Sequence, residues 1–227
     1  KPAPTQRLFC WGHLPPAADA DATRARAVER LPVDVRFWSA LGVKVVSLSY
    51  GAEHAAALDD RGRVWAWGAR AGPVPRQLPT RSAVASIAST DTSLIAAGAR
   101  GGVVEWAALD ASLADSEPGA PPAPEPVGGA LASAAVTSLA AGARHALAVT
   151  RKGELYAWGE HHHGQLGIGG PIGEAAEGTA GADAASVHHA PTRVPLDGRA
   201  TQAACGRDHS LVLLDDGAPA QPGYPGS

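Results

Sequence analysis

Apolar and polar positions alternate most clearly between residues 139 and 170. A strand-like run, His145–Thr150, is followed by the turn Thr150–Gly153 and by a second run, Glu154–Trp158. Alternation of this kind, with a glycine closing a short connection, is typical of a β-hairpin with a bulged turn. A single hairpin is unstable in water, so the prediction requires more copies elsewhere in the chain.

The hairpin pattern recurs at fixed offsets. Each of three copies begins with Gly-x-x-His and has a glycine eight residues after the histidine, and two of the three also have Trp-Gly where the second strand ends. The repeated positions are Gly51, His54, Gly62, Trp67 and Gly68; Gly142, His145, Gly153, Trp158 and Gly159; and Gly206, His209 and Gly217. A degenerate copy has Ser93 in the histidine position, with Gly101 and Trp106 at the same offsets. A constant unit with variable connections predicts an array of sheet repeats.

These motifs resemble the repeat of the RCC1 (regulator of chromosome condensation) family. The runs that carry the resemblance are Ala140–Val149, Tyr156–Gly159, Gly164–Gly167 and Pro191–Val194. The resemblance implies an all-β fold, a β-propeller that usually has seven blades, of which about four repeats are present here. Members of the family include nucleotide-exchange factors for small GTPases, and propellers in general serve many roles.

The repeats leave half a unit at each end of the chain. Leu8–Gly12 is a Trp-Gly half without its first half, and Gly206–Gly217 is a first half followed by Pro219 and Pro222. Either Leu8–Trp11 pairs with Ser210–Leu214 and closes a ring, or the chain is an arc of a larger propeller. We expect the arc, because four blades are few for this family and because proline disfavours a central strand.

The expected organisation is one propeller domain over residues 1–217. It carries inserted loops at 13–42, 110–135 and 169–190, and a Pro/Gly-rich tail follows at 218–227. Phe37 and Trp38 are expected to anchor the first loop on the sheet. The loop 110–135 is rich in Ala, Pro and Gly, which favours an extended segment without a helix. Long loops on a rigid scaffold often bind partners, so 110–135 and 169–190 are candidate binding segments.

Composition narrows the classes of partner. The 227 residues have a net charge of −3, with acids and bases intermixed along the sequence, so no basic field for nucleic acid is expected. No apolar run is long enough to span a bilayer. Cys10 and Cys205 lie in expected strands and are interpreted as buried free thiols. The chain starts at Lys1 and contains no Met, which indicates a processed chain or a fragment and leaves an intracellular compartment such as the mitochondrion open.

The histidines are the first candidates for chemistry. One histidine per blade at the start of an inner strand is expected to hydrogen-bond neighbouring backbone and join blade to blade. His161, His162, His163, His188 and His189 are weak metal-ligand candidates, because imidazoles bind zinc, nickel and copper. Consecutive residues point to alternate sides of the chain, so a solvated loop is the preferred interpretation, and no metal or other cofactor is expected.

Signals for catalysis are close to absent. Asp208-His209-Ser210 contains the residue types of a hydrolase triad, but adjacent residues cannot adopt the geometry of a triad. Motifs for a nucleophile elbow or a phosphate-binding loop are missing. The sequence therefore predicts a non-enzymatic protein–protein interaction or assembly module, a subunit or accessory factor of a larger complex with a protein partner of unknown identity. The alternative function is that of a guanine-nucleotide exchange factor for a small GTPase.

Overall fold

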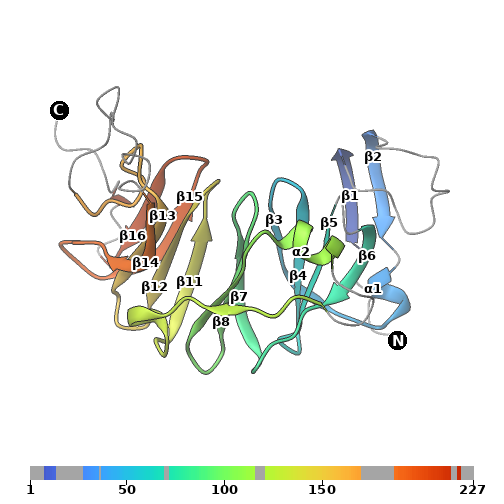
Figure 1. Ribbon diagram of the computed structural model, residues 1–227, viewed down its shortest axis with the longest axis horizontal. Coiled ribbons are helices and arrows are strands. Elements are labelled where there is room, and N and C mark those ends of the chain that lie inside the picture. The colour runs from blue at the N-terminus through green and yellow to red at the C-terminus, as the bar shows by residue number, and fades with distance from the viewer. Residues whose placement is uncertain are drawn as a thin grey trace.

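The computed structural model describes residues 8–13, 28–35, 37–68, 72–115, 121–169, 187–215 and 219–220. These residues form antiparallel sheets that stand side by side as blades, as Figure 1 shows. Helical structure in the described residues is limited to three short segments: α1 (Phe37–Ala40), α2 (Leu109–Asp115) and a 3-10 turn (Gly129–Leu131). The all-β, propeller-type fold predicted from the repeats is confirmed.

Three sheets are complete four-stranded blades in which strands pair in chain order. Blade 1 consists of β3 (Val45–Tyr50), β4 (His54–Asp59), β5 (Val64–Gly68) and β6 (Gly72–Gln77). Blade 2 consists of β7 (Val84–Ser89), β8 (Leu94–Gly98), β9 (Val103–Trp106) and β10 (Glu125–Pro126). Blade 3 consists of β11 (Val136–Ala141), β12 (His145–Thr150), β13 (Leu155–Glu160) and β14 (Val187–Arg193).

Two smaller sheets flank these blades. Blade 4 contains β15 (Ala200–Cys205), β16 (Ser210–Leu214) and the two-residue strand β17 (Pro219–Ala220). The N-terminal sheet pairs β1 (Leu8–His13) with β2 (Val28–Val35). Pro219 and Ala220 lie in the segment expected to be a tail, and they pair at the outer edge of β16, where a proline without an N–H is tolerated.

The second strand of a blade consists mostly of small apolar residues because it is covered on both faces, as β4 and β12 show. Every residue of β4 and of β12 is buried. Their sequences, His54-Ala-Ala-Ala-Leu-Asp59 and His145-Ala-Leu-Ala-Val-Thr150, are rich in alanine, which lets neighbouring blades approach closely near the centre of the array. The first strand of each of blades 1 to 4 has a register shift at the same place, after Val45, Val84, Val136 and Ala200.

An apolar core fills each contact between neighbouring blades, which we call a seam. Trp106 of blade 2 is buried against blade 1, and Trp158 of blade 3 is buried against blade 2. In the seam between blades 3 and 4, Leu147 packs with Val212. Trp38 of α1 packs edge-on against Trp65, with ring centroids 5.7 Å apart. Phe37 and Trp38 thus anchor the first inserted segment on blade 1, as the sequence predicts.

The described sheets form an arc rather than a closed ring. Figure 1 places the N-terminal sheet at one end and blade 4 at the other. Strand β1 pairs with β2, whereas β16 pairs with β15 and β17, so the pairing of Leu8–Trp11 with Ser210–Leu214 does not occur. The strands that contain Cys10 and Cys205 consequently lie at opposite ends of the arc.

The inserted segments are more structured than the sequence analysis expects. The interpretation of 110–135 as an extended loop without a helix is corrected by α2, whose Leu109 and Leu113 are fully buried in the core shared by blades 1 and 2. The rest of that stretch supplies β10 and the 3-10 turn. Segment 13–42 includes β2 and α1, and segment 169–190 reaches the start of β14, while residues 170–186 lie outside the described residues. No described helix is long and apolar enough to cross a membrane.

Candidate functional site

The blade array has two opposite faces, formed by the two sets of connections between its strands. At one end lie the Gly-x-x-His loops 51–54, 90–93, 142–145 and 206–209, which we call the loop face. At the other end lie the hairpin turns 59–63, 98–102 and 150–153 with the segments that lead into the next blade, which we call the turn face. The inner strands β4 and β12 are buried along their whole length, so a large partner can reach the described part of the array only at these faces, at the more exposed strands or at the ends of the arc.

A chain of backbone hydrogen bonds runs along the loop face. The N–H of Ala52 donates to the carbonyl of Asp91 at 2.9 Å, Asp91 donates to Ala143 at 2.8 Å, and Ala143 donates to Arg207 at 2.9 Å. These four residues occupy the same repeat position, one in each blade. The equivalent bonds make the loop face a rigid belt that links neighbouring blades.

Glycine begins these loops because a side chain would not fit. A Cβ atom at Gly142 would lie 2.5 Å from the carbonyl oxygen of Gly206 and against the ring of His145. A Cβ atom at Gly51 would be crowded in the same way by the carbonyl oxygen of Thr90 and the ring of His54. In the degenerate copy, Thr90 replaces this glycine and its hydroxyl accepts the N–H of Ser93 at 2.9 Å. A different local bond therefore holds the same loop in blade 2.

The repeated histidines occupy two environments. His54 and His145 are both 1% exposed, whereas His209 in the last copy is exposed. The Nε2 atom of His145 lies 3.0 Å from the Ser210 hydroxyl of blade 4, and that hydroxyl donates to the carbonyl of Gln165 at 2.7 Å. Burial lowers the pKa of His145, against a smaller opposing effect of Asp208, so the ring is neutral at pH 7.

This arrangement does not resemble a nucleophile and its base. Because the Ser210 proton is committed to Gln165, His145 is the donor in the contact between them. A general base would instead have to accept that proton from the serine. Ser210 is also 4% exposed, which keeps substrate away from its hydroxyl. The pair joins two blades. Ser210 entered the sequence analysis only in the rejected triad, and its contacts with His145 and Gln165 were not predicted, because these partners are remote along the chain.

The glycines of the hairpin turns allow the backbone conformation and the close approach of the next blade that the turn face requires. Gly62 and Gly153 have φ angles of +75° and +80°, the left-handed region that glycine adopts readily. The next blade also passes close by: Val84 donates to the carbonyl of Gly62 at 2.9 Å, and Ala200 donates to the carbonyl of Gly153 at 2.9 Å. Both ends of these two seams are therefore hydrogen-bonded. The position of Gly217 lies outside the described residues.

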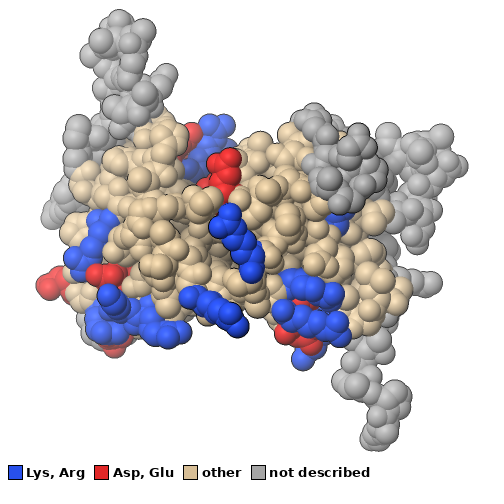
Figure 2. Space-filling view, turned by 60° about the horizontal axis from the view of Figure 1, so that its bottom comes forward, with Lys and Arg blue, Asp and Glu red and all other residues tan. Residues whose placement is uncertain are grey.

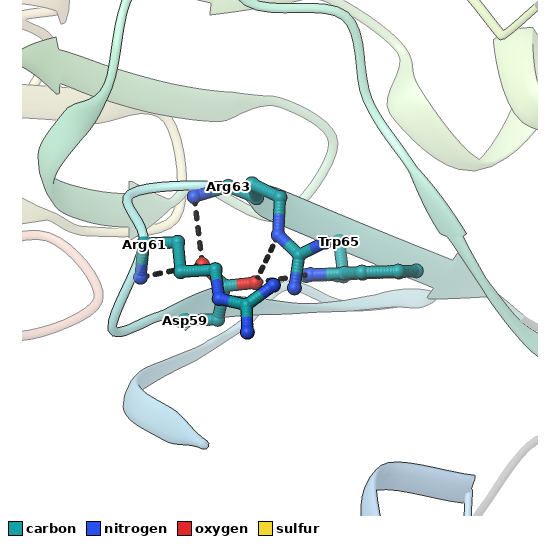
Figure 3. A network of polar contacts seen from close by, with 4 residues as sticks. All are labelled: Asp59, Arg61, Arg63 and Trp65. Carbon is teal, nitrogen blue, oxygen red and sulfur yellow. Dashed lines mark hydrogen bonds and ion pairs between the residues drawn. The ribbon is translucent and has the colours of Figure 1, made fainter. Parts of the chain in front are cut away.

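A buried carboxylate organises the first of these turns, as Figure 3 shows. One oxygen of Asp59 accepts the backbone N–H groups of Arg61 and Arg63 at 3.0 and 2.9 Å. The other accepts Nε of Arg63 at 2.6 Å and the indole N–H of Trp65 at 3.1 Å. Burial alone would raise the pKa of Asp59, but these hydrogen bonds together hold it below its ordinary value. The network presents Arg61 to solvent on a rigid turn.

Positive side chains gather on the turn face. Of the twelve Lys and Arg residues with described side chains, eight lie there: Lys44, Arg61, Arg63, Arg81, Arg100, Arg151, Lys152 and Arg199. Figure 2, turned so that the lower side of Figure 1 comes forward, shows Lys and Arg along this side of the molecule. The fold thus brings basic residues from separate stretches of the chain to one face, where Figure 2 also shows Asp and Glu among them, and the expectation that no basic field for nucleic acid exists stays a prediction.

The five clustered histidines do not form a metal site in the described residues. His161 is buried, contrary to the expectation of a solvated loop, and its ring centroid lies 5.7 Å from that of His188. His163 and His189 are exposed, and no group of three or more potential ligands gathers in the described part of the chain. The N–H of Leu166 donates to Nδ1 of His161, which places the proton of the neutral ring on Nε2, where a metal would have to bind.

The thiol of Cys205 faces the seam between blades 3 and 4. Burial raises its pKa to about 12, so the reactive thiolate is scarce at neutral pH. Cys205 is a free cysteine, as the sequence analysis expects.

Comparison with known proteins identifies the repeat. The family model described as the regulator of chromosome condensation (RCC1) repeat matches residues 152–213, and a second model with the same description matches 45–69 and 136–165. These ranges contain the repeated glycines, histidines and Trp-Gly pairs of blades 1 and 3, and Gly206 and His209 of blade 4. The chain is an RCC1-like β-propeller.

Relatives of this RCC1-like chain are much longer than it is. The Arabidopsis thaliana "Ultraviolet-B receptor UVR8" is 26% identical over 193 residues, which is 77% of this chain and 40% of the relative. The mouse "RCC1 domain-containing protein 1" is 30% identical over 172 residues, which is 71% of this chain and 41% of the relative. The chain thus spans about two fifths of the length of these curated relatives.

Two solved structures share the fold of this RCC1-like chain. The Saccharomyces cerevisiae protein Prp20p matches with a TM-score of 0.71 at 22% identity, over 96% of this chain and 54% of that protein. Human WBSCR16 matches with a TM-score of 0.61 at 22% identity, over 80% of this chain and 48% of that protein. At these identities the likeness establishes the fold alone.

Proposed function

We propose that this RCC1-like chain is a non-enzymatic protein-interaction module, a subunit or accessory factor of a larger complex, whose turn face binds an acidic surface of a protein partner. The observation that carries the proposal is the gathering of eight Lys and Arg side chains on the turn face. Exposed basic groups on one rigid face attract acidic partners and accelerate their association.

Several of these charges are available to a partner. Arg100, Arg151 and Lys152 are exposed, and they make no ion pair with any residue that the structure describes. By contrast, Arg199 pairs with Asp215, and Arg63 pairs with the buried Asp59. The hairpin turns of blades 2 and 3 therefore carry the positive charge that neighbours leave uncompensated.

The scaffold holds these charges at fixed spacing. Arg151 N–H donates to the carbonyl of Ala135 at 2.8 Å, and Ala99, next to Arg100, donates to the carbonyl of Ala83 at 2.8 Å. Each turn is therefore hydrogen-bonded to the segment that leads into its own blade. A partner that matches the spacing of the charges would not have to order these turns on binding, which favours affinity.

Capture of the native partner with charge-reversed variants tests the proposal. The test variant replaces Arg100, Arg151 and Lys152 by Glu, and the matched control replaces the exposed Arg207 of the loop face by Glu. We expect the tagged wild-type chain and the control to retain the same proteins in pull-down and mass spectrometry, and the test variant to lose them. Added salt should weaken capture. Equal capture by the test variant, or capture of nucleic acid instead of protein, would contradict the proposal.

The alternative function, nucleotide exchange on a small GTPase, rests on family resemblance and on the fold shared with Prp20p, a protein with binding properties to Gsp1p and histones. Release of a fluorescent nucleotide from a panel of small GTPases distinguishes the two functions. Acceleration of release by the wild-type chain would favour exchange, whereas a partner that is captured without any acceleration would favour the interaction module.

A further inference from the structure

A loop that follows β13 holds blade 4 against blade 3. We call residues 161–168 the histidine loop. Its Leu166 is fully buried in the apolar core that blades 3 and 4 share. The carbonyl of Gln165 accepts the hydroxyl of Ser210 at 2.7 Å, and that hydroxyl lies 3.0 Å from Nε2 of His145. The histidine loop therefore supplies one apolar and one polar contact to this seam.

A neutral imidazole helps to hold the loop in this shape. Nδ1 of His161 accepts the N–H of Leu166 at 3.3 Å. Two backbone bonds complete the turn: Gly164 donates to the carbonyl of His161 at 3.1 Å, and Gly167 donates to the carbonyl of Gly164 at 3.0 Å. An imidazolium carries a proton on both nitrogens, so a charged His161 would face the N–H of Leu166 with a second donor. The bond to the buried Leu166 therefore exists only while the ring is neutral.

The surroundings of His161 favour the neutral ring. Its residue is 6% exposed, and its ring centroid lies 5.7 Å from that of His188 on β14. Burial lowers the pKa of His161, and the carbonyl of Gly169 opposes this effect. The charges that His188 and His162 acquire in acid lower the pKa of His161 further. The closed loop thus resists protonation on the ground of packing as well as of hydrogen bonding.

Other charged groups border the same seam. His145 is also buried, and its pKa is lowered by burial, with Asp208 opposing and His209 supporting that effect. The acid next to the histidine loop, Glu160, is paired with Arg144 at 2.9 Å. His145 is therefore a second group through which acid can loosen the seam, and a test has to separate it from the histidine loop.

We propose that the histidine loop is an acid-opened latch on the seam between blades 3 and 4, closed while His161 is neutral and open when its ring is protonated. Opening withdraws Leu166 from the shared core and the carbonyl of Gln165 from Ser210. In the open loop the ring is solvated and titrates near the ordinary histidine pKa of 6.5. Because opening takes up one proton, the open fraction should rise about tenfold for each pH unit below 6.5 while the closed ring stays neutral. This inference goes beyond the proposed function and does not depend on it.

Hydrogen exchange of single amides tests the latch. His161→Asn supplies an amide oxygen that can accept the same N–H and is not protonated in mild acid, and His163→Asn, at an exposed position of the same loop, is the matched control. Exchange is followed by NMR between pH 7.5 and pH 5 and expressed as protection factors, which removes the intrinsic pH dependence. EDTA in every sample keeps metal ions from the histidines. Below pH 6.5 we expect Leu166 and Gly167 to lose about tenfold protection per pH unit in the wild type and in the control.

His161→Asn should keep that protection throughout, and amides of β5 in blade 1 should keep theirs in every variant. Constant protection of Leu166 in the wild type would overturn the proposal without any variant. An equal acid loss in His161→Asn would overturn it too, because the response would then belong to His145 or to another group. So would a loss that is equally large in β5, since that would be global unfolding.

The thiol of Cys205 reports on the seam itself, because its side chain packs against the core that contains Leu166. Labelling with 4,4′-dithiodipyridine, which reacts in acid, is quantified at Cys205 by peptide mass spectrometry and compared between variants at the same pH. We expect wild type and His163→Asn to be labelled faster than His161→Asn at pH 5.5 and all three to be equal at pH 7.5. Equal labelling at pH 5.5 would overturn the claim that the loop holds the seam closed. Melting curves at pH 7.5 verify that each variant is folded.

Discussion

The imidazole of His145 and the hydroxyl of Ser210 meet across the seam between blades 3 and 4, with Nε2 3.0 Å from Oγ. His145 begins β12 and Ser210 begins β16, so the contact joins equivalent ends of neighbouring second strands. Both residues are almost fully buried. Their contact therefore stabilises the arrangement of the blades.

His145→Ala should lower the free energy of unfolding by about 1–3 kcal/mol, because it leaves a buried hydroxyl without one of its partners. Urea unfolding followed by Trp fluorescence measures this loss. His209→Ala is the matched control: His209 is exposed at the same repeat position, and its removal should change stability by no more than about 0.5 kcal/mol. Loss of partner binding by folded His145→Ala, at unchanged stability, would show that His145 has a binding role instead.

Gly142→Ala should destabilise the chain by about 1–3 kcal/mol, because the added Cβ would press on the carbonyl of Gly206 and on the ring of His145. Thermal unfolding provides the measurement. At Gly169, with a φ of +70°, a Cβ would meet no atom within 4 Å. Gly169→Ala therefore reports backbone strain alone, about 1 kcal/mol. A loss of stability from Gly169→Ala that equals or exceeds the loss from Gly142→Ala would argue against the crowding at Gly142.

The Asp59 network makes stability depend on pH in acid. The folded pKa of Asp59 is below its ordinary value, so the stabilisation is complete above the unfolded pKa and is lost as pH falls through the folded pKa. Asp59→Asn should therefore unfold more easily at pH 7 and show a smaller further loss between pH 4 and pH 2 than the wild type. Asp60→Asn, at an exposed neighbouring position, should keep the wild-type profile; identical profiles for Asp59→Asn and wild type would contradict the assignment.

Leu113→Ala tests whether α2 is part of the core. Leu113 is fully buried between blades 1 and 2, so its truncation should cost about 2–5 kcal/mol. Ala114→Ser, on the same helix at an exposed position, should be close to neutral. A small effect of Leu113→Ala in denaturant unfolding would restore the interpretation of 110–135 as a dispensable loop.

Local patterns made most of the fold predictable. The offsets between Gly142, His145, Gly153 and Trp158 reflect one hairpin, whose turn and strands depend on neighbours in sequence. The helix α2 had a signal too, because Leu109 and Leu113 are four residues apart, as apolar residues on one helical face are. The prolines that follow it favoured the loop interpretation, and the burial of both leucines depends on tertiary packing.

The candidate site was less predictable because its parts are far apart in sequence. Arg61, Arg100 and Arg151 lie in turns of three different blades, and only the folded array brings those turns to one face. Asp59 had a local signal, since an acid or Thr three residues before a turn glycine can accept backbone N–H groups, as Thr150 also does. The contact between Ser210 and Gln165 had no such signal.

Hydrogen exchange of the chain with and without its captured partner tests the central claim most directly. If the turn face binds an acidic protein surface, amides in the turns 59–63, 98–102 and 150–153 should gain protection in the complex. Amides in the loops 51–54, 90–93 and 142–145 should stay unchanged. Protection confined to those loops, with the three turns unaffected, would contradict the account and move the binding site to the opposite face.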